Sequence, residues 1–224
     1  GSIMTNPNIE IFEKLSKAAV QADREKSCIS LIAVSKQQPE ERIENSLASG
    51  QRIFGENRVQ EASQRWQGRK SVYPDLELHL IGPLQSNKAA DAVALFDVIH
   101  TVDRPKIALA LSREMESAQR MLPCFIQVNT GEEEQKAGIL PHELDTFLSF
   151  CRKEAGLQIV GLMCIPPIDE EPALHFALLK TLAARHDLFQ LSMGMSADFE
   201  TAILFGATHI RVGSALFGSR PTPS

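Results

Sequence analysis

The sequence lacks the features that mark several large classes of protein. Its four cysteines are scattered and form no C-x-x-C pair, so neither zinc-binding spacing nor a disulfide framework is indicated. No apolar run reaches the roughly 18 residues that a membrane-spanning helix needs. The nucleotide-binding patterns G-x-x-x-x-G-K-[ST] and G-x-G-x-x-G are also missing. We therefore expect a protein of the reducing cytoplasm with no metal site and no membrane partner.

Positive charge is also scarce. The 23 Lys and Arg residues are outnumbered by 28 Asp and Glu residues, and the net charge of −5 argues against a nucleic-acid partner bound through a basic face. The remaining composition is that of a globular chain, because 43% of the 224 residues are hydrophobic and 23% are charged. No linker divides the chain. We interpret residues 1–7 as a cloning remnant and flexible leader, 8–220 as one domain, and 221–224 as a flexible tail.

Apolar runs alternate with helical patterns along the whole domain. Eight runs have the length and apolar character of strands that are buried on both faces. They cover residues 31–35, 52–54, 76–81, 98–102, 124–128, 158–164, 188–193 and 208–212. Patterns with helical spacing precede and separate them, at residues 8–26, 39–47, 58–66, 86–95, 105–120, 141–153, 172–185 and 198–205. An opening helix followed by eight strand–helix units predicts a single (β/α)8 barrel, and a doubly wound open sheet is the alternative.

Polar residues gather where the predicted strands end, which is where such barrels carry their chemistry. Lys36 directly follows the first apolar strand, and an amine beside a low-dielectric barrel mouth can form a Schiff base. The alternative is that Lys36 reaches solvent or pairs with Glu56. After the seventh and eighth strands, Gly and Ser residues offer N–H and hydroxyl groups for a phosphate. The alternative there is that Ser196 only caps the helix that follows.

Five ordered segments carry a resemblance to a known family. They are AVSK at 33–36, FGENRVQE at 54–61, HLIGPLQSNK at 79–88, LSMGMS at 191–196 and RVGSALFG at 211–218. Together they closely resemble the YggS/PROSC family of pyridoxal-phosphate homeostasis proteins, over about residues 29–218. That family is a pyridoxal 5′-phosphate (PLP) barrel of fold type III, similar to the N-terminal domain of alanine racemase without its second, β-rich domain.

The resemblance implies a role for each of eight residues. Lys36 holds PLP as a Schiff base, and Arg211 faces the pyridine nitrogen. A guanidinium only donates hydrogen bonds, so it disfavours a protonated pyridine nitrogen and weakens the cofactor as an electron sink. The residues expected at the phosphate are Ser196, Gly213 and Ser214, and those expected at the ring pocket are Asn57, His79 and Met163.

The family resemblance implies a carrier that buffers PLP and maintains vitamin B6 and amino-acid homeostasis without strong turnover. Racemases of similar fold use a tyrosine opposite the lysine, whereas the only tyrosine here, Tyr73, precedes the third strand and should lie at the far end of the barrel. His79, His100 and Cys164 are weaker replacements. We therefore assign no catalytic residue. An amino-acid racemase with Lys36 as its single base remains the alternative, and a barrel that binds a sugar or keto-acid phosphate is a third hypothesis.

A carrier also needs recipients and a route for release. PLP-dependent apo-enzymes are the expected recipients, and attack by another amine would free the cofactor from Lys36. Lys88 and Lys136 lie near predicted strand ends and are candidate relay amines, although a solvated surface role is the alternative for both. Since the dimer contacts of the racemases come from their second domain, a monomer is expected.

Overall fold

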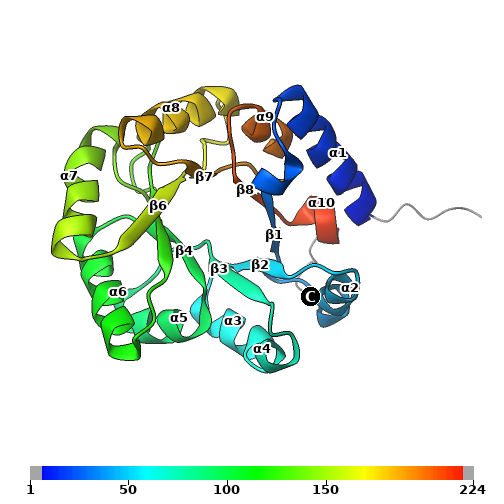
Figure 1. The fold of residues 1–224 in the computed structure, drawn as a ribbon, viewed down its shortest axis with the longest axis horizontal. Helices are drawn as coiled ribbons and strands as arrows, with labels where there is room; N and C mark the ends of the chain where they lie inside the picture. The colour runs from blue at the N-terminus through cyan, green and yellow to red at the C-terminus, as the bar shows by residue number, and fades with distance from the viewer. Residues whose placement is uncertain (1–6, 219–224) are drawn as a thin grey trace, which may run out of the picture.

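The eight expected strands pair in chain order and close into one parallel barrel (Figure 1). In the computed structural model, which describes residues 7–218, they are β1 (Ser30–Val34), β2 (Ile53–Glu56), β3 (Glu77–Leu80), β4 (Val98–Val102), β5 (Pro123–Gln127), β6 (Gln158–Met163), β7 (Gln190–Ser192) and β8 (His209–Val212). β8 closes the barrel by pairing with β1, where Ile32 lies opposite Arg211. The predicted (β/α)8 barrel is confirmed.

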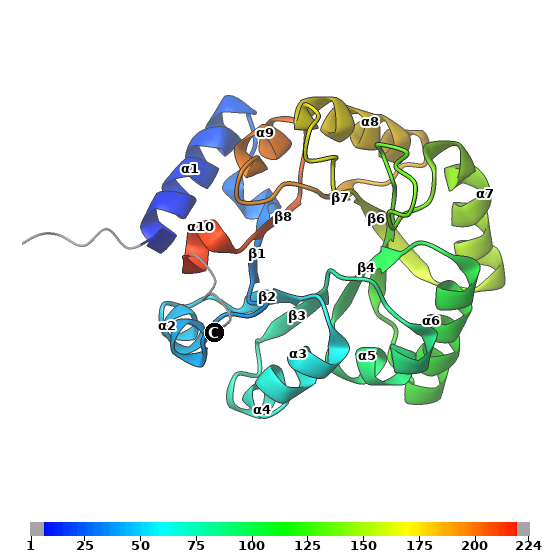
Figure 2. The same ribbon diagram turned by 180° about the vertical axis from the view of Figure 1, so that it is seen from behind.

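A ring of helices surrounds the barrel (Figure 2). They are α1 (Pro7–Gln21), α2 (Glu40–Ala48), α3 (Val59–Trp66), α4 (Arg69–Val72), α5 (Ala89–Leu95), α6 (Pro105–Ala118), α7 (Leu144–Ser149), α8 (Pro172–Arg185), α9 (Phe199–Leu204) and α10 (Ser214–Phe217). The short helices α4 and α10 were not expected. Of the proposed leader 1–7 only Pro7 is described, and the proposed tail 221–224 lies outside the described residues.

Three predicted helices differ from the observed ones. The pattern at 86–95 predicts one helix, but its first turn, Ser86–Lys88, is a 3-10 turn that precedes α5. The pattern at 141–153 predicts one helix, but the structure has a 3-10 turn at Pro141–Glu143, then α7, then a π-helical turn at Phe150–Glu154. The pattern at 8–26 predicts a helix longer than α1, which ends at Gln21. The chain turns at Asp23, whose φ is 55°, and then forms a 3-10 turn at Lys26–Cys28. Apolar spacing alone does not distinguish these helix types.

The barrel separates an apolar outer layer from a polar interior. Strand side chains that face the helices build the main core, for example through Phe54 and Trp66, whose ring centroids lie 4.4 Å apart. Inside the barrel, Val98, Phe125 and Met163 form a second, small apolar cluster. His100 stacks on Phe125 at 4.5 Å, and the side chain of Arg211 is also buried. Polar groups therefore lie beneath the barrel mouth.

No helix between residues 7 and 218 combines the length and apolar character needed to cross a membrane.

Candidate functional site

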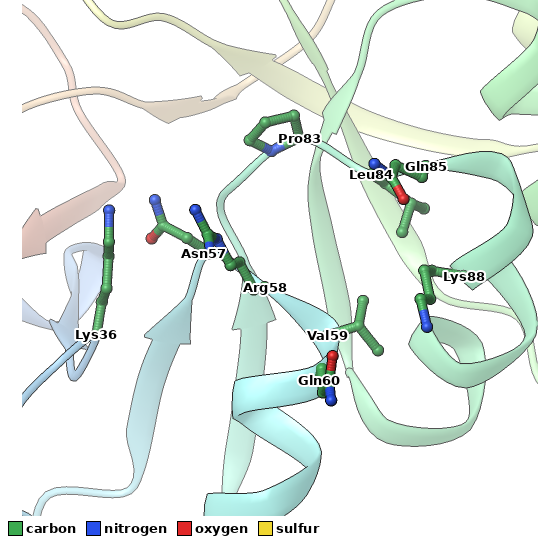
Figure 3. A pocket seen from close by; sticks show the side chains of 9 residues that line it. All are labelled: Lys36, Asn57, Arg58, Val59, Gln60, Pro83, Leu84, Gln85 and Lys88. Carbon is green, nitrogen blue, oxygen red and sulfur yellow. The ribbon is translucent and has the colours of Figure 1, made fainter.

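Lys36 lies in a cavity of about 510 Å³ at the carboxyl ends of β1, β2 and β3. Figure 3 shows its amine and the amide of Asn57 extending in the same direction from the loops after β1 and β2. The rest of the lining is Arg58, Val59, Gln60, Pro83, Leu84, Gln85 and Lys88. Three cations and no carboxylate line this cavity. It is therefore suited to an anionic ligand that can react with an amine.

The backbone that carries Lys36 is fixed by buried polar groups. Ser35 donates its hydroxyl to Glu56 Oε1 at 2.5 Å, and Arg65 donates to the carbonyl oxygens of Ser35 and Gln38. Arg65 also pairs with Glu56 at 3.0 Å, and the indole N–H of Trp66 donates to the same carboxylate oxygen at 3.0 Å. These contacts tie α3 to the loop after β1, so the start of the Lys36 side chain is held in place.

Glu56 does not pair with Lys36, which was the alternative that the sequence left open. Its carboxylate is buried and takes Ser35, Arg65 and Trp66 as partners, while Oε2 has no hydrogen-bond partner. Burial raises the pKa of this carboxyl, although the three donors oppose the rise. Lys36 makes no side-chain hydrogen bond or ion pair with any described residue. Its amine is available for chemistry.

A second cavity, of about 860 Å³, opens at the ends of β6, β7 and β8. Val34 lines it from β1, two residues before Lys36, so the two cavities flank the same strand. Ser196, Arg211, Gly213 and Ser214 all line it. The structure thus brings the four residues expected at the phosphate and the pyridine nitrogen into one cavity, and Lys36 with Asn57 into its neighbour.

Ser196 does not cap α9, the helix that follows it, but accepts from backbone N–H groups at the start of α10. The N–H groups of Gly213 and Ala215 both point at its hydroxyl oxygen, at 3.2 and 3.3 Å. The position before α9 belongs to Asp198, whose carboxylate accepts from the N–H of Met195 at 2.8 Å. Both hydrogen bonds are long, so the two N–H groups could instead donate to a stronger acceptor such as a phosphate oxygen.

Arg211 is held from one side by two acceptors. Its Nη1 donates to Ser192 Oγ at 2.6 Å and its Nη2 donates to the carbonyl oxygen of Cys164 at 2.9 Å. The side chain is only 4% exposed and forms no ion pair within residues 7–218. Burial lowers its pKa, but a guanidinium stays protonated in proteins. A fixed cation with remaining N–H donors therefore faces the second cavity.

Two of the eight predicted site residues lie deeper than expected. His79 is 1% exposed and hydrogen-bonds to His100, and Met163 packs against Val98 and Phe125 inside the barrel. Neither residue lines either cavity. His79 and Met163 therefore support the floor of the barrel mouth in this structure, and a direct role at the cofactor ring stays a prediction.

The remaining candidates occupy different positions around the barrel. Lys88 lines the Lys36 cavity, but Figure 3 places it on the opposite side from Lys36. Lys136 is exposed and lines neither cavity. Tyr73 lies before β3, at the amino end of the strands, as expected. Cys164 is buried, and burial raises the pKa of its thiol to about 12.

Sequence reasoning missed Ser192, Arg65 and Trp66. Ser192 stands in a motif that was identified, but its partner Arg211 belongs to another strand. Arg65 and Trp66 end α3, which begins at Val59, directly after Asn57 and Arg58. Alternation on β8, where His209 and Arg211 are two residues apart, is a signal that both side chains point into the barrel. Which groups they meet depends on barrel closure.

Fold and site together define a (β/α)8 barrel with a free amine and an anion cradle at its mouth. Residues 14–221 match the family model described as "Alanine racemase, N-terminal domain". The chain is 40% identical to the pyridoxal phosphate homeostasis protein of Vibrio cholerae over 95% of each chain, and 38% identical to that of Escherichia coli over 94% of each chain. The structure of PipY from Synechococcus elongatus with PLP bound matches with a TM-score of 0.79 and 40% identity, and the match covers 92% of this chain and 100% of PipY.

The chain belongs to the alanine racemase N-terminal domain family, and within it to the pyridoxal phosphate homeostasis proteins.

Proposed function

We propose that this protein binds pyridoxal 5′-phosphate and acts as a carrier that buffers the cofactor, as the names of its relatives and the PLP-bound PipY structure suggest. The observation that carries the proposal is the placement of an unpartnered amine and an anion cradle on the two sides of the end of β1. PLP carries a phosphate group and an aldehyde group. A PLP site therefore needs an anion cradle for the phosphate and an amine for the aldehyde.

The residues present fit this cofactor. Ser196, Gly213 and Ser214 would hold the phosphate, because the converging N–H groups of Gly213 and Ala215 are suited to an anion. When bound, PLP supplies an aldehyde with which an amine condenses with loss of water. Lys36 is the amine whose nitrogen is unpaired, and Arg211 is a fixed cation that would donate to the ring nitrogen without accepting a proton.

The site favours storage over catalysis. A carbanion-forming PLP enzyme benefits from a carboxylate that stabilises the protonated pyridine ring, whereas the residue in that role here is Arg211. Tyr73 is at the amino end of the strands, away from Lys36. We propose PLP-dependent apo-enzymes as recipients. A cytoplasmic location and a monomeric state stay predictions.

Borohydride trapping tests the proposal. The purified protein is incubated with PLP, reduced with borohydride and digested, and mass spectrometry locates the adduct. We expect one dominant adduct at Lys36, and its complete loss in Lys36→Ala, since no other lysine has this position. Lys88→Ala is the matched control, because it removes a lysine from the same cavity and should leave the adduct unchanged. A wild-type protein without any adduct would refute PLP binding at this site.

Amino-acid turnover separates a carrier from a racemase. Exchange of the α-hydrogen of alanine for deuterium is measured with the loaded protein and with free PLP at the same concentration. For a carrier we expect equal rates in the two samples. A rate well above that of free PLP that disappears in Lys36→Ala would show that the protein is an enzyme.

A further inference from the structure

An unbroken chain of hydrogen bonds crosses the barrel from its amino end to Arg211. Glu77, at the start of β3, contacts His79 Nε2 at 2.8 Å through Oε1, and His79 Nδ1 lies 2.8 Å from His100 Nε2. His100 Nδ1 lies 2.8 Å from Ser192 Oγ, which accepts from Arg211 Nη1 at 2.6 Å. Glu77 is about half exposed, whereas the four other side chains are buried. Four strands contribute to this chain, β3, β4, β7 and β8.

The Arg211 end favours one direction for these hydrogen bonds. A guanidinium has no acceptor, so Ser192 Oγ must accept from Arg211. The hydroxyl then has one hydrogen to give, and the neighbouring polar atom is His100 Nδ1. The remaining nitrogen of a neutral His100, Nε2, then carries the hydrogen and donates to His79.

The Glu77 end is compatible with the same direction. An ionised carboxylate only accepts, and the hydrogen bond from His79 lowers the pKa of Glu77 and so favours its ionised form. His79 therefore carries its hydrogen on Nε2, and in the neutral ring Nδ1 is free to accept from His100. One proton arrangement therefore satisfies every group from Glu77 to Arg211.

The surroundings keep the central imidazole neutral. His100 stacks on Phe125, and burial holds the pKa of His100 well below its usual range, with further lowering from His79, His209 and Arg211. A positive His100 would donate to Ser192, whose oxygen would then face two donors. The hydroxyl hydrogen of Ser192 would then have no acceptor among these hydrogen-bonded groups.

We propose that Glu77, His79, His100 and Ser192 form a positioning relay that fixes the hydrogen-bonding face of Arg211 from within the barrel. With Nη1 held by Ser192 and Nη2 by the carbonyl of Cys164, the other N–H groups of the guanidinium serve the ligand. The relay orients Arg211 and links it to the negative charge of Glu77. The inference rests on the proposed PLP function only for the identity of that ligand.

Nitrogen NMR of the imidazole rings tests the relay in the ligand-free wild-type protein. Nitrogen shifts and couplings distinguish the two neutral tautomers from the charged ring. We expect His100 to be neutral, and we expect both rings to carry hydrogen on Nε2 and none on Nδ1. A hydrogen on Nδ1 of either ring, or a charged His100 at neutral pH, would overturn the proposed arrangement. This measurement needs neither a variant nor bound PLP.

An isosteric pair of variants tests the effect on Arg211. Ser192→Thr keeps the hydroxyl, whereas Ser192→Val has the same shape without it, so any strain from the added methyl groups is shared. We expect PLP to bind to Ser192→Val at least about tenfold more weakly than to Ser192→Thr, since a hydrogen bond to a charged group is lost. The pH titration of the visible band of bound PLP should also move in the Val variant only.

A third variant controls for disturbance of the barrel interior. Val98→Ala changes a buried side chain in the same interior cluster without touching a hydrogen bond of the relay, and should match the wild type in affinity and titration. Equal affinity and equal titration of the Thr and Val variants would overturn the relay. If both fail to fold, the NMR result decides. A failure of PLP binding itself appears separately, as a wild-type protein without a Lys36 adduct.

Discussion

The two cations of the proposed site, Lys36 and Arg211, are held in opposite ways. The Lys36 loop is fixed through its backbone by Arg65, while the amine itself is unpartnered and half-buried. The Arg211 side chain is buried and is bound through two of its own nitrogens. A reacting amine must move and exchange protons, whereas a permanent cation is useful only when it is fixed. The barrel thus immobilises the base of one side chain and the tip of the other.

Removing Glu56 should produce the largest effect on the Lys36 side of this comparison. Glu56→Ala leaves Arg65, Ser35 and Trp66 without their shared acceptor in a buried position. We expect the free energy of unfolding to fall by about 3 to 5 kcal/mol, the usual cost of breaking a buried ion pair by removing one partner. Urea denaturation measures it.

Glu44→Ala is the matched control for this change. Glu44 also pairs with an arginine, Arg69, at 2.6 Å, but its side chain is 53% exposed. Exposed ion pairs contribute about 0 to 1 kcal/mol, so this variant should stay close to the wild type. If Glu56→Ala costs no more than Glu44→Ala, the buried contacts do not fix the Lys36 loop.

Acid should lower the free energy of unfolding through His209, a buried histidine two residues before Arg211 on β8. Burial, with a contribution from His79, lowers the pKa of His209 from 6.5 to about 4. The unfolded chain therefore takes up this proton first as the pH falls. The stabilisation is complete above the unfolded pKa and is lost as the pH drops towards about 4, by about 3 kcal/mol in all.

A comparison of unfolding free energies at neutral pH and at about pH 4 tests this sign. His209→Gln should lose about 3 kcal/mol less than the wild type between the two conditions. His186→Gln, which removes a histidine paired with the exposed Asp145, is the control and should follow the wild type. Parallel curves for the wild type and His209→Gln would contradict the assignment of a neutral, buried imidazole.

The same contrast explains how much of the molecule could be predicted from its sequence. The barrel followed from apolar runs that alternate with helical patterns, since strands buried on both faces have few polar positions; β4, for example, is buried along its whole length. Lys36 was singled out because it comes directly after such a run, and Ser196 because it follows another run by three residues. Short helices such as α4 and α10 were missed because four residues carry too little periodicity.

The relay could not be predicted because its contacts join distant strands. Ser192 and His100 are 92 residues apart, and their meeting depends on the stagger and closure of the barrel. The resemblance places His79 in the ring pocket, and the structure adds contacts with Glu77 and His100 that no pattern in the sequence indicates. A strand pattern gives the side on which a residue lies, but not the depth at which side chains from opposite strands meet.

The smallest expected effects concern the two candidate relay amines. Lys88 shares the cavity of Lys36 but lies across it, and Lys136 lines neither cavity. We expect Lys88→Ala to slow transfer of PLP to a PLP-dependent apo-enzyme by only about twofold to fivefold, the range for a partly exposed charge, and Lys136→Ala to leave the rate unchanged. Recovery of the recipient's activity over time measures transfer.

If PLP is held on Lys36 as proposed, its release would need another amine or water to attack the aldehyde-derived carbon. A lysine on the far side of the cavity can attract the anionic cofactor without attacking it. Lys88→Arg separates these two roles, because arginine keeps the charge but is not a nucleophile at neutral pH. If the charge alone matters, Lys88→Arg should transfer at the wild-type rate while Lys88→Ala is slower. If Lys88→Arg slows transfer as much as Lys88→Ala does, Lys88 is itself a reacting amine. Lys36 would then not be the only mobile, reactive cation of the site.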